Sequence, residues 1–162
     1  MIKIAYLHGL GSNNQGPKNE WLRTVSHVFD PQIDYYEKDI YQKLKKEVLI
    51  FKPNIVIGSS MGGYFAYQMA RELNIKALLF NPALHSRSME PDVSGRNNGI
   101  FKPKMHFVFG ENDEVIPYKE TIKILLNDGY DDSFFHILNH AHDTPIEVFK
   151  SEISNFILTE KF

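Results

Sequence analysis

Short runs of apolar residues alternate along this chain with longer segments in which apolar residues recur every three or four positions. The short runs predict buried β-strands, and the recurring positions predict amphipathic α-helices. The predicted strands span residues 2–7, 33–37, 55–57, 76–80, 105–109 and 134–138. The predicted helices span residues 21–29, 40–49, 62–73, 118–126 and 146–157. Segment 33–37 is more polar than the other strands, so we expect it at an edge of the sheet.

This alternation of strands with helices of about a dozen residues is typical of βαβ units, which build parallel sheets. Continuous apolar strands such as ALLF at 77–80 indicate a sheet that is covered on both faces. We therefore predict an α/β fold, a three-layer α/β/α sandwich with a mostly parallel sheet of about six strands, in a single domain spanning 1–162. The 84–102 segment is rich in Ser, Asn, Gly and Pro, which makes it a long loop and a candidate lid.

Composition narrows the class of protein. The chain has 162 residues, a formal net charge of -2, 43% hydrophobic residues and no cysteine. No basic run favours nucleic acid or a membrane surface as a partner. The lack of cysteine excludes disulfides and thiol nucleophiles, and with no signal peptide or membrane span in view we expect a cytoplasmic protein.

Polar residues with catalytic potential follow several of the predicted strands. His8 follows the first, Ser60 the strand at 55–57, Asp113 the strand at 105–109, and His140 and His142 the last. The carboxyl ends of parallel strands share one edge of the sheet, where ligands bind. The sequence thus predicts that a serine, an acid and a histidine meet there.

Residues 58–62 read Gly-Ser-Ser-Met-Gly, a G-x-S-x-G pattern with Ser60 at its centre. A serine on a sharp turn between a strand and a helix projects its hydroxyl outward, and small neighbours allow the turn. Ser59 is then the small residue that precedes the nucleophile. The alternative is a tight or phosphate-binding glycine turn, although neither glycine-rich nucleotide motif is present.

These motifs in this order resemble the α/β-hydrolase superfamily. The YLHG opening, the GSSMGGY turn and the NPAL segment after the next strand are similar to the small bacterial YqiA-type esterases. The resemblance covers nearly the whole chain and implies a serine hydrolase that acts on carboxylic esters or thioesters without a cofactor.

The resemblance also implies roles for individual residues. Ser60 would be the nucleophile, and the backbone N–H groups of Met61 and Leu10 would form the oxyanion hole. Asp113 would be the acid that orients the catalytic histidine, with Glu111 and Glu114 as rivals in the same turn. His8 is expected to brace its loop.

Two histidines compete for the role of general base. The sequence Asn-His-Ala favours His140, whereas the distance from the last strand and the Ala-His-Asp-Thr-Pro context favour His142. We predict His142, with His140 as the alternative. A zinc site at His140, His142 and Asp143 is a further alternative, but the additional ligands it needs are not found in the sequence.

The expected substrate is a small-molecule ester or thioester with a small or medium apolar acyl group. Leu10 and Tyr64 are the predicted substrate contacts, with Met61 and Phe101 nearby. No metal is predicted, and the oligomeric state is not readable. One other class stays open: an α/β-hydrolase fold that has lost catalysis and serves as a binding module. A flavodoxin-like domain shares the layout, but it would need phosphate-binding loops or an acidic cluster after the first strand, and residues 8–14 supply neither.

Overall fold

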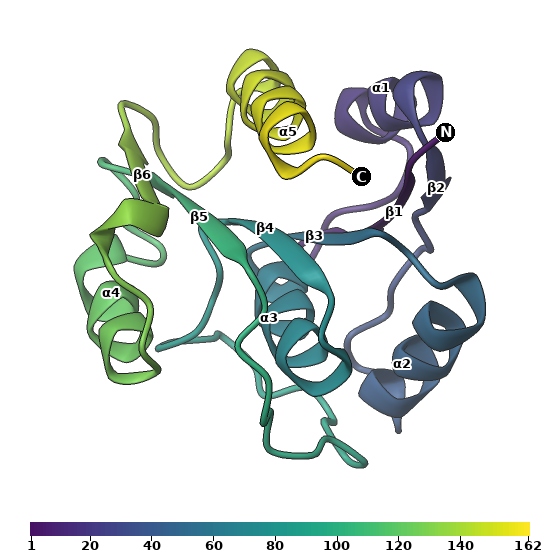
Figure 1. Cartoon of the computed structure of the whole chain (residues 1–162). Helices are drawn as coiled ribbons and strands as arrows, with labels where there is room; N and C mark the ends of the chain where they lie inside the picture. Colours follow the sequence, from purple (N-terminus) through teal and green to yellow (C-terminus); the bar gives the residue numbers. More distant parts are fainter.

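A computed structural model describes residues 1–162 as a six-stranded sheet flanked by helices (Figure 1). The strands are β1 (Lys3–Leu7), β2 (His27–Phe29), β3 (Ile55–Ser59), β4 (Lys76–Phe80), β5 (Met105–Gly110) and β6 (Phe135–Leu138). The helices are α1 (Pro17–Val25), α2 (Ile40–Phe51), α3 (Met61–Leu73), α4 (Tyr118–Asn127) and α5 (Ile146–Glu160), and a 3₁₀ turn, η1, spans Asp132–Phe134. All neighbouring strands are parallel, in the order β2-β1-β3-β4-β5-β6.

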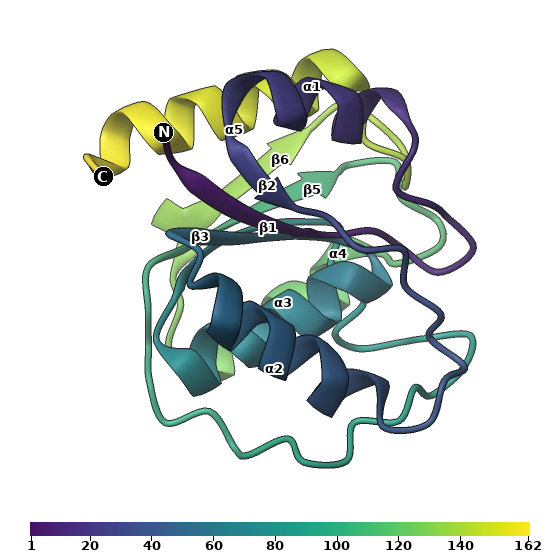
Figure 2. The same ribbon diagram turned by 90° about the vertical axis from the view of Figure 1, so that its right-hand side faces the viewer.

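Helices cover both faces of the sheet, which gives the predicted three-layer sandwich (Figure 2). Helices α1 and α5 lie on one face, and α2, α3 and α4 lie on the other. Successive residues of a strand point to opposite faces, so Ala5 and Leu7 join the core beneath α2 and α3, while Ile4 and Tyr6 join the core beneath α1 and α5. This explains why the strands are apolar at consecutive positions.

The second strand differs from the sequence prediction. Residues 27–29, predicted as the end of a helix, form β2, and residues 33–37, predicted as a strand, lie outside the sheet. Helix α1 ends at Val25, because Ser26 adopts an extended backbone with φ −149° and ψ 165°. The Ser26 hydroxyl and backbone N–H both donate to the Leu22 carbonyl, which satisfies this end of the helix. The chain then pairs with β1 for three residues. Residues 27–29 are too few for the spacing of their apolar side chains to distinguish a short strand from the end of a helix.

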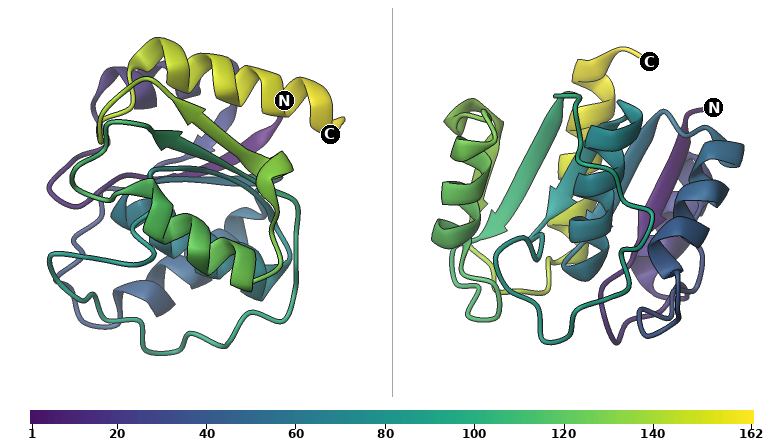
Figure 3. Two further views of the ribbon diagram at one scale, coloured as in Figure 1. Left: turned by 90° about the vertical axis from the view of Figure 1, so that its left-hand side faces the viewer. Right: turned by 90° about the horizontal axis from the view of Figure 1, so that it is seen from below.

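The 84–102 segment contains no helix or strand, as predicted. It leaves the carboxyl edge of the sheet and runs along the outer side of α2 and α3 (Figures 2 and 3). Backbone hydrogen bonds join Asp92 to Tyr41 of α2 and Phe101 to Arg71 of α3. Most of the segment is therefore fastened to these helices, and its first residues alone line a cavity beside Ser60.

Candidate active site

Ser60 stands on a strained turn between β3 and α3. Its backbone has φ 53° and ψ −114°, a combination that non-glycine residues rarely adopt. Hydrogen bonds from the Ser60 N–H to the Phe80 carbonyl and from the Ala83 N–H to the Ser60 carbonyl hold it in place. This conformation is that of a serine nucleophile elbow, and it leaves the side chain partly exposed at the sheet edge.

The glycines of the turn are explained by close backbone contacts. A Cβ atom on Gly62 would lie 1.9 Å from the Leu7 carbonyl oxygen, and one on Gly58 would lie 2.2 Å from the Gly62 carbonyl oxygen. The first turn of α3 therefore rests directly on the ends of β1 and β3. Only glycine at both positions brings the N-terminus of the helix beneath Ser60.

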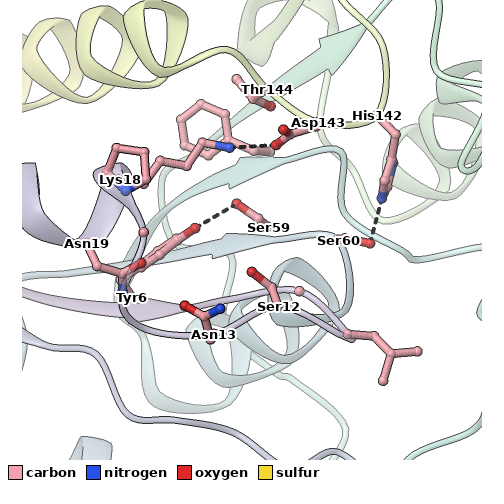
Figure 4. Close-up of a pocket in the computed structure, with 15 residues that line it drawn as sticks. Tyr6, Ser12, Asn13, Lys18, Asn19, Ser59, Ser60, His142, Asp143 and Thr144 are labelled. Atoms are coloured by element: carbon pink, nitrogen blue, oxygen red, sulfur yellow. Dashed lines mark hydrogen bonds and ion pairs between the residues drawn. The ribbon is translucent and has the colours of Figure 1, made fainter.

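His142 lies between Ser60 and Asp113. Its Nε2 atom is 2.9 Å from Ser60 Oγ, and its Nδ1 atom is 2.7 Å from Asp113 Oδ2 (Figure 4 shows the first of these). A carboxylate only accepts hydrogen bonds, so Nδ1 carries the proton and Nε2 is free to accept from the serine hydroxyl. The three side chains come from the ends of three strands, β3, β5 and β6.

The Asp113 carboxylate is fully buried and held from both sides. Its Oδ1 atom accepts hydrogen bonds of 2.8 Å from the N–H groups of Val115 and Ile116, which leaves Oδ2 for the histidine. The rival acids Glu111 and Glu114 are exposed and do not contact His142. The structure thus brings Asp113 alone of these acids to the histidine.

His140, the alternative base, lies away from Ser60. It is buried, its Nδ1 donates to the Ala141 carbonyl at 2.8 Å, and its Nε2 has no protein partner. It packs against Gly110, where a Cβ atom would lie 2.8 Å from His140 Nδ1. His140 therefore supports the loop that carries His142.

Asn81 was missed as a functional residue and connects the strands that carry the acid and the base. Its side-chain Nδ2 donates to the His142 carbonyl at 2.7 Å, and its Oδ1 accepts from the Gly110 N–H at 2.7 Å. Asn81 is buried and has a positive φ of 43°, which asparagine tolerates better than most residues. The NPAL segment that begins at Asn81 served only as part of the family resemblance, and nothing in the sequence pattern predicted these contacts.

Two residues that line a cavity with Ser60 have backbone N–H groups that their own segment does not use. The N–H of Met61 belongs to the first turn of α3, where no intrahelical acceptor exists, and the N–H of Leu10 is not used by the loop that follows β1. That loop passes close to the serine, since a Cβ atom on Gly9 would lie 3.4 Å from the Ser60 Cβ. These N–H groups are the candidates for an oxyanion hole.

His8 braces the same loop. Its Nδ1 donates to the Gly9 carbonyl at 2.8 Å, and its Nε2 accepts from the Ile33 N–H at 2.9 Å. Burial lowers the pKa of His8, which favours the neutral ring that this pair of bonds requires. Tyr35 donates to the His8 carbonyl as well, so the segment predicted as a strand instead supports the loop carrying Leu10.

Two cavities open on either side of Ser60, and Leu10, Ser60 and His142 line both. The first, of about 350 Å³, has a polar lining that includes Lys18 and Asp143. The second, of about 360 Å³, has a more apolar lining that includes Met61 and Ile116.

Two predicted substrate contacts lie behind the cavity walls. Tyr64 lines neither cavity; the Arg87 guanidinium covers its ring at 4.1 Å, and Arg96 donates to its hydroxyl. Arg87 itself lines the second cavity, so Tyr64 supports that wall from behind. Phe101 is bound at Arg71, about 15 Å along α3 from the nucleophile, and is not part of the site.

The zinc alternative does not match the arrangement of the side chains. His142 is directed to Ser60, His140 to a backbone carbonyl, and Asp143 to Lys18. The three groups therefore do not converge on one point.

None of the helices combines the length and apolar character needed to cross a membrane.

Comparison with protein families gives one match to this chain, over residues 3–102, to the Uncharacterised protein family UPF0227. The chain belongs to this family. The matched residues hold Ser60, Met61 and Leu10, whereas Asp113 and His142 lie beyond them. The part of the site that the family model describes is therefore the nucleophile turn and the loop after β1.

Solved structures with the same fold are α/β hydrolases. An α/β-hydrolase enzyme from a lagoon-sediment metagenome has a TM-score of 0.74 and 17% identity, over 99% of this chain and 92% of that one. Est1E from Butyrivibrio proteoclasticus has a TM-score of 0.67 and 14% identity, over 98% of this chain and 87% of that one. A Paleococcus ferrophilus monoacylglycerol lipase has a TM-score of 0.71 and 12% identity, over 97% and 94%. The protein therefore has the α/β-hydrolase fold that the sequence predicted.

Proposed function

We propose that this protein is a serine hydrolase that cleaves small to medium acyl esters or thioesters through an acyl-enzyme intermediate. The observation that carries the proposal is the continuous hydrogen-bonded series from Ser60 Oγ through His142 to Asp113, with distances of 2.9 and 2.7 Å. The strained backbone at Ser60 supports it, because strain of this kind gathers at functional sites.

In the first half of the reaction, Ser60 Oγ attacks the acyl carbonyl and its proton moves to His142 Nε2. The carbonyl oxygen gains negative charge, which the N–H groups of Leu10 and Met61 stabilise by hydrogen bonding. Asp113 stabilises the imidazolium that forms. The carbon–oxygen or carbon–sulfur bond to the leaving group then breaks, and the leaving group takes the proton from His142.

In the second half, water attacks the acyl-enzyme. His142 accepts a proton from this water, the same N–H groups stabilise the second oxyanion, and the bond to Ser60 Oγ breaks as the serine regains its proton. The products are a free acid and a regenerated serine. The open edge of the sheet supports this step, since Ser60 and His142 are both partly exposed.

The proposal is tested with p-nitrophenyl acetate and butyrate, and with a fluorophosphonate probe that reacts with activated serines. The wild-type protein should hydrolyse the esters and take up one probe at Ser60. Ser60→Ala should lose the labelling, and kcat should fall by about 10⁴-fold or more in Ser60→Ala and His142→Ala.

His140→Ala is the matched control, since it removes a neighbouring histidine that does not contact Ser60. It should keep most of the activity per folded molecule. A wild-type protein that neither reacts with the probe nor turns over the esters would overturn the proposal and favour a non-catalytic binding module. A dead His140→Ala beside an active His142→Ala would overturn the assignment of the base.

A further inference from the structure

The polar cavity beside Ser60 is lined by side chains that can form hydrogen bonds with a bound molecule. Lys18, from the first turn of α1, and Asp143, from the loop after β6, meet across it at 2.9 Å (Figure 4). Tyr6 and Asn13 also line it, and the Tyr6 hydroxyl lies 3.4 Å from Ser59 Oγ. An alkyl chain placed here would remove water from these groups without replacing their hydrogen bonds, which is unfavourable.

Lys18 is the charged group that lies deepest in this cavity. Its side chain is 19% exposed, whereas that of Asp143 is 97% exposed. The Lys18 ammonium lies 5.6 Å from the centre of the Phe149 ring, so one side is packed against the core. An ammonium has three donors and Asp143 takes one of them. The exposed side of the ammonium leaves a further donor for a ligand.

The second cavity has a different lining, and this difference indicates which half of the ester lies in which cavity. Met61, Ala83 and Ile116 give it a largely apolar wall, and the N–H of Met61, a candidate oxyanion donor, lies at its edge. The first cavity instead continues past His142 to Asp143 and Thr144. His142 lines both cavities, but Asp143 and Thr144, which follow it in the chain, line the first alone. His142 must protonate the leaving group, so we place the alcohol half of an ester in the first cavity, beside these neighbours of His142.

We propose that Lys18 and Asp143 form a subsite for the hydroxyl groups of the leaving alcohol, so that the protein prefers esters of small neutral polyols with a short apolar acyl chain. This inference rests on the proposed function. The apolar chain occupies the cavity lined by Met61 and Ile116, and the alcohol occupies the cavity lined by Lys18 and Asp143. Lys18 is then a specificity-determining residue.

Because the charges of Lys18 and Asp143 are paired, the subsite should bind a neutral alcohol better than an anionic one. Lys18 and Asp143 together carry no net charge, so a carboxylate or phosphate on the alcohol would be attracted by the ammonium and repelled by the carboxylate. A hydroxyl group can accept from Lys18 and donate to Asp143 at the same time. The pair therefore suits a hydroxyl group better than an anion.

The test uses butyrate esters that differ only in the alcohol: ethyl butyrate, 2-hydroxyethyl butyrate and carboxymethyl butyrate. Each kcat/KM is divided by the rate constant for alkaline hydrolysis of the same ester, which removes differences in chemical reactivity. The wild-type protein should prefer the hydroxyethyl ester to the ethyl ester by roughly tenfold, as for a hydrogen bond to a charged group. The carboxymethyl ester should be the poorest substrate.

Two variants of the subsite give opposite expectations. Lys18→Met keeps a long side chain over Phe149 but loses the donors, and should abolish most of the preference for the hydroxyethyl ester. Asp143→Asn leaves the Lys18 charge unbalanced, and should raise the relative rate with the carboxymethyl ester by about fivefold. Lys123→Met, which removes the same charge from an exposed ion pair on α4, is the control and should leave the preferences unchanged.

Several outcomes would overturn the inference while the proposed function stands. Fluorophosphonate labelling of Ser60 with equal normalised rates for the three esters would show that the cavity does not select the alcohol. If Lys18→Met lowered the normalised kcat/KM equally for all three esters, Lys18 would act in folding or catalysis and not in selection of the alcohol. If Lys18→Met instead changed the ratio between ethyl butyrate and ethyl 3-hydroxybutanoate, the acyl half would occupy this cavity. A wild-type protein without labelling or turnover would remove both proposals.

Discussion

The Asn81 side chain donates a hydrogen bond of 2.7 Å to the backbone carbonyl of His142. The same side chain accepts from the Gly110 N–H at the end of β5, the strand that leads to Asp113. One buried amide therefore fixes the spacing between the strand that leads to Asp113 and the loop that carries His142. This relationship gives the first of four predictions.

Asn81→Asp should lower kcat by up to about 10²-fold with a smaller change in KM, because the carboxylate can accept from Gly110 but repels the His142 carbonyl. Steady-state kinetics on p-nitrophenyl butyrate measure the two constants. Asn155→Ala, which removes an exposed asparagine on α5, is the control. Normal kcat in folded Asn81→Asp would show that the loop needs no such brace.

Gly110→Ala should displace the loop that carries His142, because the new Cβ would lie 2.4 Å from the Ala141 carbonyl oxygen and 2.5 Å from that of His140. Activity should fall more steeply than stability. Gly129→Ala is a matched comparison: its positive φ of 90° also strains an alanine, but the site is at the end of α4 and the nearest atom belongs to the flexible Lys102. Gly129→Ala should therefore lower the melting temperature and leave kcat unchanged, and a loss of kcat there would refute the explanation.

Replacement of the nucleophile should separate backbone strain from chemistry. Ser60 has φ 53° and ψ −114°, which costs on the order of 1–3 kcal/mol in a residue with a Cβ. Ser60→Gly and Ser60→Ala should both be inactive, but the glycine variant should be more stable by about 1 kcal/mol, since glycine adopts this conformation without strain. Urea unfolding measures the difference, and equal stabilities would show that the turn is not strained.

His136 should titrate above the usual range for histidine. Its Nδ1 lies 2.6 Å from Glu152, and this hydrogen bond raises the pKa of His136. His106 packs against it at 5.3 Å between ring centres, and burial lowers the pKa of His106. Lys104 and Glu160 lie close enough to influence His106 as well.

Glu152→Gln should therefore return the pKa of His136 toward 6.5, as measured by NMR titration of the ring protons. A raised pKa in the folded state stabilises the fold fully below the unfolded value, and this stabilisation is lost as the pH rises through the folded value. The stability difference between wild type and Glu152→Gln should thus be largest below pH 6.5 and should shrink at higher pH. The pair is partly exposed, so the effect should stay below about 1 kcal/mol, and a difference that grew with pH would contradict it.

Five of the six strands and the turn around Ser60 could be predicted because each depends on a local pattern. Apolar runs such as 76–80 are buried on both faces and could be placed to the residue. The turn around Ser60 could be placed because Gly58 and Gly62 are required by backbone contacts that leave no room for a side chain. These requirements are visible in one short stretch of sequence.

Features that depend on distant contacts could not be predicted. Residues 27–29 form a strand only because β1 offers them a free edge. His142 was predicted over His140 from the residues around it, but the contacts of Asn81 and Gly110 that set the path of the loop after β6 had no signal in the sequence. Lys18 and Asp143 are far apart in the sequence, and the patterns that include Asp143 do not involve Lys18, so their meeting in the cavity had no local signal.

The course of the 84–102 segment has a consequence for the fate of an acyl-enzyme. Because this segment lies along α2 and α3, it does not close over Ser60, and both cavities beside the serine stay open to bulk solvent. Enzymes that transfer acyl groups to another alcohol must keep water away from the intermediate. An acyl group on Ser60 would instead face water at its full concentration, so the intermediate would partition toward the free acid, and added alcohols without a second hydroxyl group for Lys18 and Asp143 to bind would compete poorly as acceptors.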